Sequence, residues 1–256
     1  MAAGASTRES NRLRQLTLPV AAAVALAVAA AWYVTWSTSD LSMSLLMMPV
    51  GLTGPGNLVL FFALLVVMMV AMMLPSALPM ILTFHGLTGL EGGASSKPAD
   101  GTTTALFVAP YFLVWGGFSL LALLGIAALG LLGPLTGAPA LLPAGVLLAA
   151  GVWQVTRTKA VCLRHCQSPV GFVMHHWQSG RLGAFCMGLR HAAYCIGCCW
   201  LFMLVLFLAG AMSLVWMGAL SLVILVEKVG PRTALVPRAI GVVLVVAGVI
   251  LAAHAA

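Results

Sequence analysis

The sequence predicts an all-α fold, a polytopic bundle of about seven transmembrane helices with its N-terminus in the cytoplasm and its C-terminus outside. Of the 256 residues, 62% are apolar and 7% are charged, against about 25% charged residues in an average soluble domain. The apolar residues stand in long runs without charges, whereas a transmembrane β-barrel would alternate apolar and polar positions. These observations exclude a water-soluble globular protein and a disordered chain.

Seven apolar runs give the predicted spans, and each reaches or approaches the roughly 17–25 residues that cross a bilayer. The runs cover residues 16–36, 58–82, 105–132, 138–155, 191–211, 212–226 and 239–256. The second run is rich in Met and contains Pro75 and Pro79, and the sixth is the shortest. The fifth and sixth follow each other almost directly, so we expect them to form a tight antiparallel hairpin.

The predicted bundle is a single domain, residues 16–256, preceded by a short cytoplasmic tail over residues 1–15. Three arginines precede the first run, as they would in a signal peptide. The run itself is 21 residues long, which exceeds the about 7–15 residues of a usual signal-peptide core. We therefore expect the first span to be a retained anchor.

The positive charges indicate how the spans are oriented. With seven alternating spans and a cytoplasmic N-terminus, the inside segments are residues 1–15, 83–104, 156–190 and 227–238. These segments hold all 12 Lys and Arg residues, and the outside segments hold none. Because Lys and Arg favour cytoplasmic loops, the net charge of +7 indicates orientation, and we expect no nucleic acid partner.

Cysteine and histidine are concentrated in one part of the chain, between residues 162 and 199. All six Cys and four of the six His lie there, in and after the predicted cytoplasmic Cys/His-rich loop 156–190. Cytosolic thiols are kept reduced, so a disulfide framework is not expected. The remaining interpretations are metal binding, thiol redox chemistry and the packing of small residues.

One face of the predicted fifth span carries soft and borderline metal ligands. At about 100° per residue, Met187, His191, Cys195 and Cys198 lie within about 60° of one another, and Cys199 lies one step aside. This face offers an imidazole and two or three thiols over two helical turns.

The segment after the fourth span supplies a second group of ligands, namely Cys162, His165 and Cys166. Two such groups that meet across a connecting segment typically assemble a tetrahedral sulfur and nitrogen site. The spacer between Cys166 and Cys195 has 28 residues and is longer than that of a zinc ribbon.

The second span carries a row of methionines. Met69, Met73, Ser76 and Met80 project to one side of a helix within about 60°, and His85 follows the cytoplasmic end. At about 1.5 Å per residue, these thioethers should lie at the same depth as the thiols. Such a row is also compatible with packing alone, but thiolates and thioethers together favour Cu(I) over harder ions.

Four segments resemble a bacterial family of predicted metal-binding integral membrane proteins, a domain of unknown function. The segments are residues 67–79, 154–172, 187–203 and 212–231, with the motifs MMxPS, CLxxC and YCxGCCW. The resemblance covers roughly residues 57–231 and departs from the family at Arg157, where a Pro is usual, and at Gln167, where an Arg is usual. It implies metal binding in a bacterial membrane and supplies no reaction.

Together these observations predict a multi-pass protein of the bacterial inner (plasma) membrane that handles Cu(I) as a chaperone, a store or a permease-like carrier. The predicted metal ligands are Cys162, Cys166, Cys195, Cys198, Cys199, His165 and His191. The predicted relay positions are Met69, Met73, Met80, Met187 and His85. The expected partners are membrane lipid and a cytosolic copper carrier or a membrane copper enzyme.

Other functions stay open at this point. Cys195 and Cys198 form a C-x-x-C pair that a membrane thiol oxidoreductase could use. Haem binding through His191 or His85 and a structural Zn site are further alternatives. No nucleophile, base and acid set is evident, which argues against an enzyme. At the end of the sixth span, we expect Glu227 and Lys228 to form an interfacial ion pair, with a proton or metal role as the alternative.

Overall fold

The computed structural model describes residues 2–47, 54–88, 100–128, 141–210, 213–230 and 233–255. The regular elements within these ranges are all helices, which confirms the predicted all-α class. They are α1 (Ala2–Ser37), α2 (Ser39–Met47), α3 (Pro55–Thr88), α4 (Gly101–Ala128), α5 (Leu141–Trp153), α6 (Arg157–Gln167), α7 (Pro169–His176), α8 (Gly180–Gly210), α9 (Leu214–Val229) and α10 (Leu235–Ala255).

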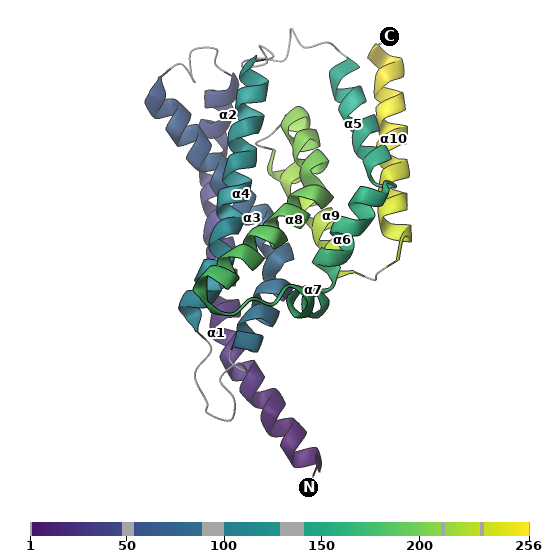
Figure 1. Ribbon diagram of the computed structural model, residues 1–256. Coiled ribbons are helices and arrows are strands. Elements are labelled where there is room, and N and C mark those ends of the chain that lie inside the picture. Colours follow the sequence, from purple (N-terminus) through teal and green to yellow (C-terminus); the bar gives the residue numbers. More distant parts are fainter. Residues whose placement is uncertain are drawn as a thin grey trace.

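Five stretches of helix are long and apolar enough to cross a membrane. They are Thr17–Ser37, Pro55–Thr88, Gly101–Gly125, Gly180–Phe207 and Leu235–Ala255. The other two predicted spans are also helical but shorter, since α5 has 13 residues and α9 has 16, against the roughly 17–25 that a span needs. The count of seven and the orientation stay predictions. Figure 1 places the two termini at opposite ends of the bundle, which is compatible with an odd number of passes.

The predicted loop 156–190 is largely helical. It folds as α6, α7 and the first turns of α8, which begins eleven residues before the predicted fifth span. The Thr156 side chain caps α6 by accepting a hydrogen bond from the Lys159 backbone N–H at 3.3 Å, and Pro169 occupies the first turn of α7, where proline is favoured. Within the early turns of α8, Arg181 and Arg190 are exposed while Met187 is buried. The two guanidinium groups therefore stay in contact with water, and α8 can remain helical through this segment.

α3 and α8 lie at the centre of the helix packing. α4 packs along α8, α1 packs along α3, and α5 pairs with α10. α6 lies against α8, and α9 contacts both α3 and α8 (Figure 1). The contact of α8 with α9 is what the predicted hairpin requires, although its connecting residues 211–212 lie outside the described ones.

Two glycines of α8 permit the close approach of neighbouring helices. A Cβ atom at Gly188 would overlap the backbone of Phe107 on α4, and one at Gly197 would come within 2.6 Å of the Cys162 sulfur on α6. A larger residue at either position would push the helices apart or displace a side chain. These contacts set the positions of α4 and α6 against the cysteine-bearing turns of α8.

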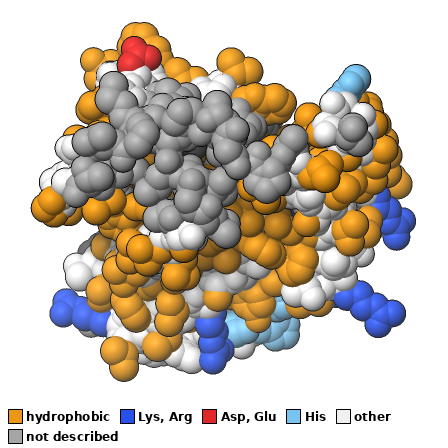
Figure 2. All heavy atoms as spheres, turned by 90° about the horizontal axis from the view of Figure 1, so that it is seen from above, with side chains coloured by type: hydrophobic (Ala, Val, Ile, Leu, Met, Phe, Trp, Pro, Cys, Tyr) orange, Lys and Arg blue, Asp and Glu red, His pale blue; other side chains and the backbone are white. Residues whose placement is uncertain are grey.

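The outside of the bundle is strongly apolar. Large hydrophobic side chains lie exposed along the long helices, for example Leu26 on α1, Leu121 on α4 and Val243 on α10. Figure 2 shows hydrophobic side chains over much of the described surface on the face in view. Apolar surface of this extent suits contact with lipid.

Candidate metal centre

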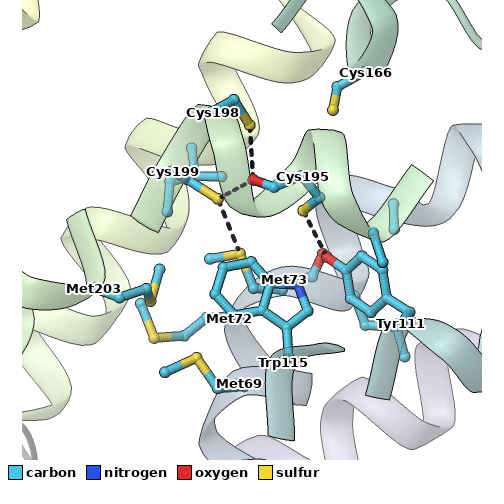
Figure 3. Close-up of a cluster of buried hydrophobic side chains, with 14 of the residues drawn as sticks. Met69, Met72, Met73, Tyr111, Trp115, Cys166, Cys195, Cys198, Cys199 and Met203 are labelled. Carbon is cyan, nitrogen blue, oxygen red and sulfur yellow. Dashed lines mark hydrogen bonds between the residues drawn. The ribbon is translucent and has the colours of Figure 1, made fainter. Parts of the chain in front are cut away.

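Three thiols occupy one buried turn of α8. Cys195, Cys198 and Cys199 are each at most 2% exposed. The thiols of Cys198 and Cys199 donate hydrogen bonds to the Cys195 carbonyl oxygen at 3.1 Å and 2.8 Å. Figure 3 shows the resulting arrangement, in which the three sulfurs spread around the turn toward different neighbouring helices.

α6 brings two more thiols to this turn of α8. Cys166 is buried and faces Cys198 closely enough for the two thiols to influence each other. Cys162 is half-buried, and its sulfur lies directly over Gly197. The structure thus brings the two cysteine groups of the sequence analysis together across the contact between α6 and α8.

The surroundings of the α6 thiols favour their protonated form. The interaction with the Cys198 thiol, followed by burial, raises the pKa of Cys166 well above its ordinary value. Burial, followed by the charge of Cys198, raises the pKa of Cys162. Metal ions bind thiolates, so a metal bound here must displace protons from both residues.

The thioethers of α3 lie on another side of the same cluster. The Cys199 thiol is 3.8 Å from the Met73 sulfur, and Met69, Met72 and Met203 are buried beside it (Figure 3). Of the other predicted relay positions, Met80 is buried in α3. The Met187 sulfur accepts a hydrogen bond from the Gln178 backbone N–H at 3.4 Å, just before α8.

Two residues that the sequence analysis did not assign to the site contact the Cys195 sulfur. The Lys228 ammonium on α9 lies 2.9 Å from this sulfur and 3.1 Å from the Ser76 hydroxyl, and only 5% of Lys228 is exposed. The Tyr111 hydroxyl lies 3.2 Å from the same sulfur and donates to the Met73 carbonyl oxygen at 3.1 Å. A Lys within an apolar segment is the sequence signal that could have identified Lys228.

The prediction that Glu227 and Lys228 pair at the membrane interface is wrong. Both residues are buried, and the Glu227 carboxylate instead accepts from the Lys159 ammonium at 2.8 Å. Successive residues of a helix point about 100° apart, so they do not face each other. Each of the two charged side chains therefore finds its partner on a different helix.

The predicted histidine ligands lie in different surroundings. His191 is 5% exposed, and its ring packs among the rings of Phe107, Tyr111 and Phe172. Neither of its ring nitrogens has a hydrogen-bond partner among the residues that the structure describes. A buried imidazole without a partner is uncommon and is available to a ligand. His85 is also buried, and its Nδ1 is 2.7 Å from the Thr104 hydroxyl.

His165, which is next to Cys166 in the chain, lies against an aromatic ring of α8. Its ring stacks on the ring of Tyr194, with the centroids 4.1 Å apart. Its Nδ1 donates to the Val161 carbonyl oxygen at 2.9 Å.

The sulfur atoms form pairs between helices instead of one tetrahedral group. In the described part of the chain, no three His, Cys, Asp or Glu side chains are arranged to hold one metal ion. The pairs are Cys166 with Cys198, and Cys199 with Met73. A structural Zn site needs four ligands, whereas soft sulfur donors in small number suit Cu(I).

Comparison with known proteins agrees with this donor set. Residues 62–251 match the PpoB2 family, which is described as a copper chaperone family. The matched range includes all four segments that carry the resemblance to a metal-binding membrane family. Comparisons with curated proteins and with solved structures give no match. Since the match covers well over half of the chain, this protein belongs to the PpoB2 copper chaperone family.

Proposed function

We propose that the protein is a membrane-embedded Cu(I) chaperone that holds the ion in the buried sulfur cluster between α3, α6 and α8. The observation that carries this proposal is the pairing of soft sulfur donors from separate helices, Cys166 with Cys198 and Cys199 with Met73. Copper is the cargo that the protein accepts and releases. The donor set contains thiols and thioethers, which are the ligand types that Cu(I) prefers.

The geometry of the cluster fits a site from which the ion can leave. The sulfurs of Cys199 and Met73 are 3.8 Å apart, a separation that two sulfurs bound to one ion at about 2.3 Å each can adopt. A thioether carries no charge and binds more weakly than a thiolate. An ion that moves from the Cys166 and Cys198 pair toward Met73 therefore becomes easier to release.

The charge around Cys195 favours a monovalent ion. Cu(I) bound by two thiolates carries a net charge of −1, and the buried Lys228 ammonium beside Cys195 neutralises it. A divalent ion bound by two thiolates is neutral and would leave that ammonium without a counterion, which is costly inside a protein. The pair of Lys159 and Glu227 is neutral in itself and does not alter this balance.

The proposed setting is the bacterial inner membrane, with the α6 side of the cluster toward the cytoplasm. The distribution of Lys and Arg along the chain and the resemblance to a bacterial membrane family support this placement. A cytosolic copper carrier would deliver the ion, and a membrane or extracytoplasmic copper protein would receive it. Direct contact between partners would keep the ion from being released into water.

Metal analysis of the full-length protein in detergent, purified without oxygen and under reducing conditions, tests the proposal. We expect bound Cu(I) in the wild type, and loss of this copper when Cys166→Ser and Cys198→Ser are combined. Cys186→Ser is the matched control, because Cys186 is a half-buried free thiol of α8 outside the cluster. If the wild type instead contains stoichiometric zinc and no copper, and the double variant loses that zinc, the site is a structural zinc site.

A further inference from the structure

A group of histidines outside the sulfur cluster has the features of a second metal site. We propose that His165 of α6 and His176 of α7 form a two-imidazole Cu(I) site at the surface, from which the ion passes inward to the thiols. This inference rests on the proposed copper function and adds the place where the ion first binds.

Hydrogen bonds fix both imidazoles in the form that binds metals. The Nδ1 atom of His165 is 2.9 Å from the Val161 carbonyl oxygen, and that of His176 is 3.0 Å from the Phe172 carbonyl oxygen. A carbonyl oxygen only accepts, so each Nδ1 carries a proton and Nε2 is the ring nitrogen left to bind an ion. The same arrangement, with a backbone carbonyl behind the ring, orients the histidine ligands of many metal sites.

Packing holds the two rings at a separation that one ion could bridge. Their centroids are 6.1 Å apart with an interplanar angle of 60°, and two imidazoles on one ion with bonds of about 2.0–2.1 Å have centroids about 5–6.5 Å apart. His165 stacks on Tyr194, and His176 stacks on Phe172 at 4.8 Å. The rings are therefore positioned before any ion arrives.

The two histidines line one surface pocket of about 410 Å³, together with Arg164, His175 and three other residues. Among the residues that the structure describes, no carboxylate lines this pocket. Without an anionic ligand, and with Arg164 at its wall, the pocket disfavours a divalent cation more than a monovalent one. Two neutral imidazoles are a sufficient ligand set for Cu(I), which accepts low coordination numbers.

The position of the pair suits transfer to the cluster. His165 directly precedes Cys166, and the ring on which it stacks belongs to Tyr194, which directly precedes Cys195. An ion held by the imidazoles would therefore lie beside the segments of α6 and α8 that carry the buried thiols. Thiolates bind Cu(I) more strongly than imidazoles do, so the ion would move inward down a gradient of affinity.

Titration of the reduced full-length protein in detergent with Cu(I), followed by X-ray absorption spectroscopy, tests the inference. In the wild type we expect the first bound ion to show sulfur ligands alone, and an additional, weaker ion to show imidazole scattering. The variant with His165→Phe and His176→Phe keeps both aromatic stacks but lacks the nitrogens. It should bind one ion fewer and lose the imidazole signal, whereas His254→Phe at the far end of α10 should not.

The result that overturns the inference is an unchanged copper stoichiometry and imidazole signal in the double variant, or no imidazole signal in the wild type. Failure of the proposed function would look different, because the sulfur-bound ion would then be missing from wild type and variant alike. If the apo double variant has the same unfolding temperature as the wild type, the changes act on binding and not on folding.

Discussion

At the scale of single residues, the site depends on what surrounds Cys195. Its sulfur contacts both the Lys228 ammonium and the Tyr111 hydroxyl, while the Cys198 and Cys199 thiols bond to its carbonyl oxygen. One residue therefore links α4, α8 and α9 at the point where the donors gather. Under the proposed function, this buried ammonium would favour a monovalent ion without being a ligand itself.

Replacing Lys228 should weaken copper binding. Lys228→Met keeps a long apolar side chain but removes the charge, and a hydrogen bond to a charged group is worth about 1.5–3 kcal/mol. We expect the Cu(I) affinity, measured by competition with a chelator, to fall about 10- to 100-fold. The ratio of the Cu(I) affinity to the Zn(II) affinity should also fall. The double change of Lys159→Met and Glu227→Leu, which removes a neutral pair, is the control. An unchanged affinity for Lys228→Met would refute the charge argument.

The affinity for Cu(I) should also depend on pH. Because the pKa of Cys166, a proposed ligand, is raised, this residue is a protonated thiol at neutral pH in the free protein, and copper binding at the proposed site would release its proton. The affinity should therefore rise with pH and level off only above the raised pKa. Competition titrations across pH measure this slope, and Cys166→Ser should make it shallower. A slope that Cys166→Ser leaves unchanged would show that this thiol is not a ligand.

At the scale of elements, close contacts along α8 hold the site together. Gly188 allows the backbone of α4 to approach, which places Phe107 and Tyr111 around His191, and Gly197 allows the approach of α6. Small residues at such contacts are typical of helices that pack inside membranes. The geometry of the donors is therefore a property of how three helices meet.

Gly188→Ala should destabilise the protein. The added methyl would overlap the Phe107 backbone, and backbone cannot rotate away as a side chain can, so we expect a loss of about 1–3 kcal/mol. Thermal unfolding in detergent measures the effect. Gly218→Ala on α9 is the matched control, because a Cβ there meets nothing within 4 Å. Equal unfolding temperatures for the two variants would show that α4 and α8 are not in close contact there.

The sequence predicted the helical class and both cysteine groups, because these depend on composition and on spacing along one helix. It did not predict that residues 156–190 are helical or that α8 begins at Gly180, since exposed arginines are compatible with a loop or a helix end. The roles of Lys228 and Tyr111 depend on contacts between separate helices. Spacing within one helix carries no information about such partners.

At the scale of the whole molecule, the fold is a helical bundle with a strongly apolar outer surface and a polar cluster in its interior. The buried charges, thiols and imidazoles of the described residues belong to α3, α6, α8 and α9, whereas the described side chains of α1 and α10 present mainly apolar exposed surface. Under the proposed function, this arrangement would isolate a soft metal from water, and α6 and α7 lie at one end of the bundle (Figure 1). Access to the cluster should therefore come from that end.

The predicted orientation can be tested with reporter fusions. A reporter after residue 256 should be extracytoplasmic, and one inserted within residues 91–100, mostly outside the described residues, should be cytoplasmic. The reason is that all Lys and Arg residues fall in the segments predicted to face inward. Finding both reporters on the same side would reject the seven-span arrangement.

The central claim is that Cu(I) is bound by the buried sulfurs, and copper K-edge X-ray absorption of the full-length protein loaded with one equivalent tests it most directly. The account predicts two or three sulfur ligands at about 2.2–2.3 Å and no nitrogen or oxygen ligand in this first ion. The combination of Cys166→Ser and Cys198→Ser should abolish this spectrum, and Cys186→Ser should preserve it. A first copper ion bound by nitrogen or oxygen alone, with the same spectrum in all three proteins, would contradict the claim.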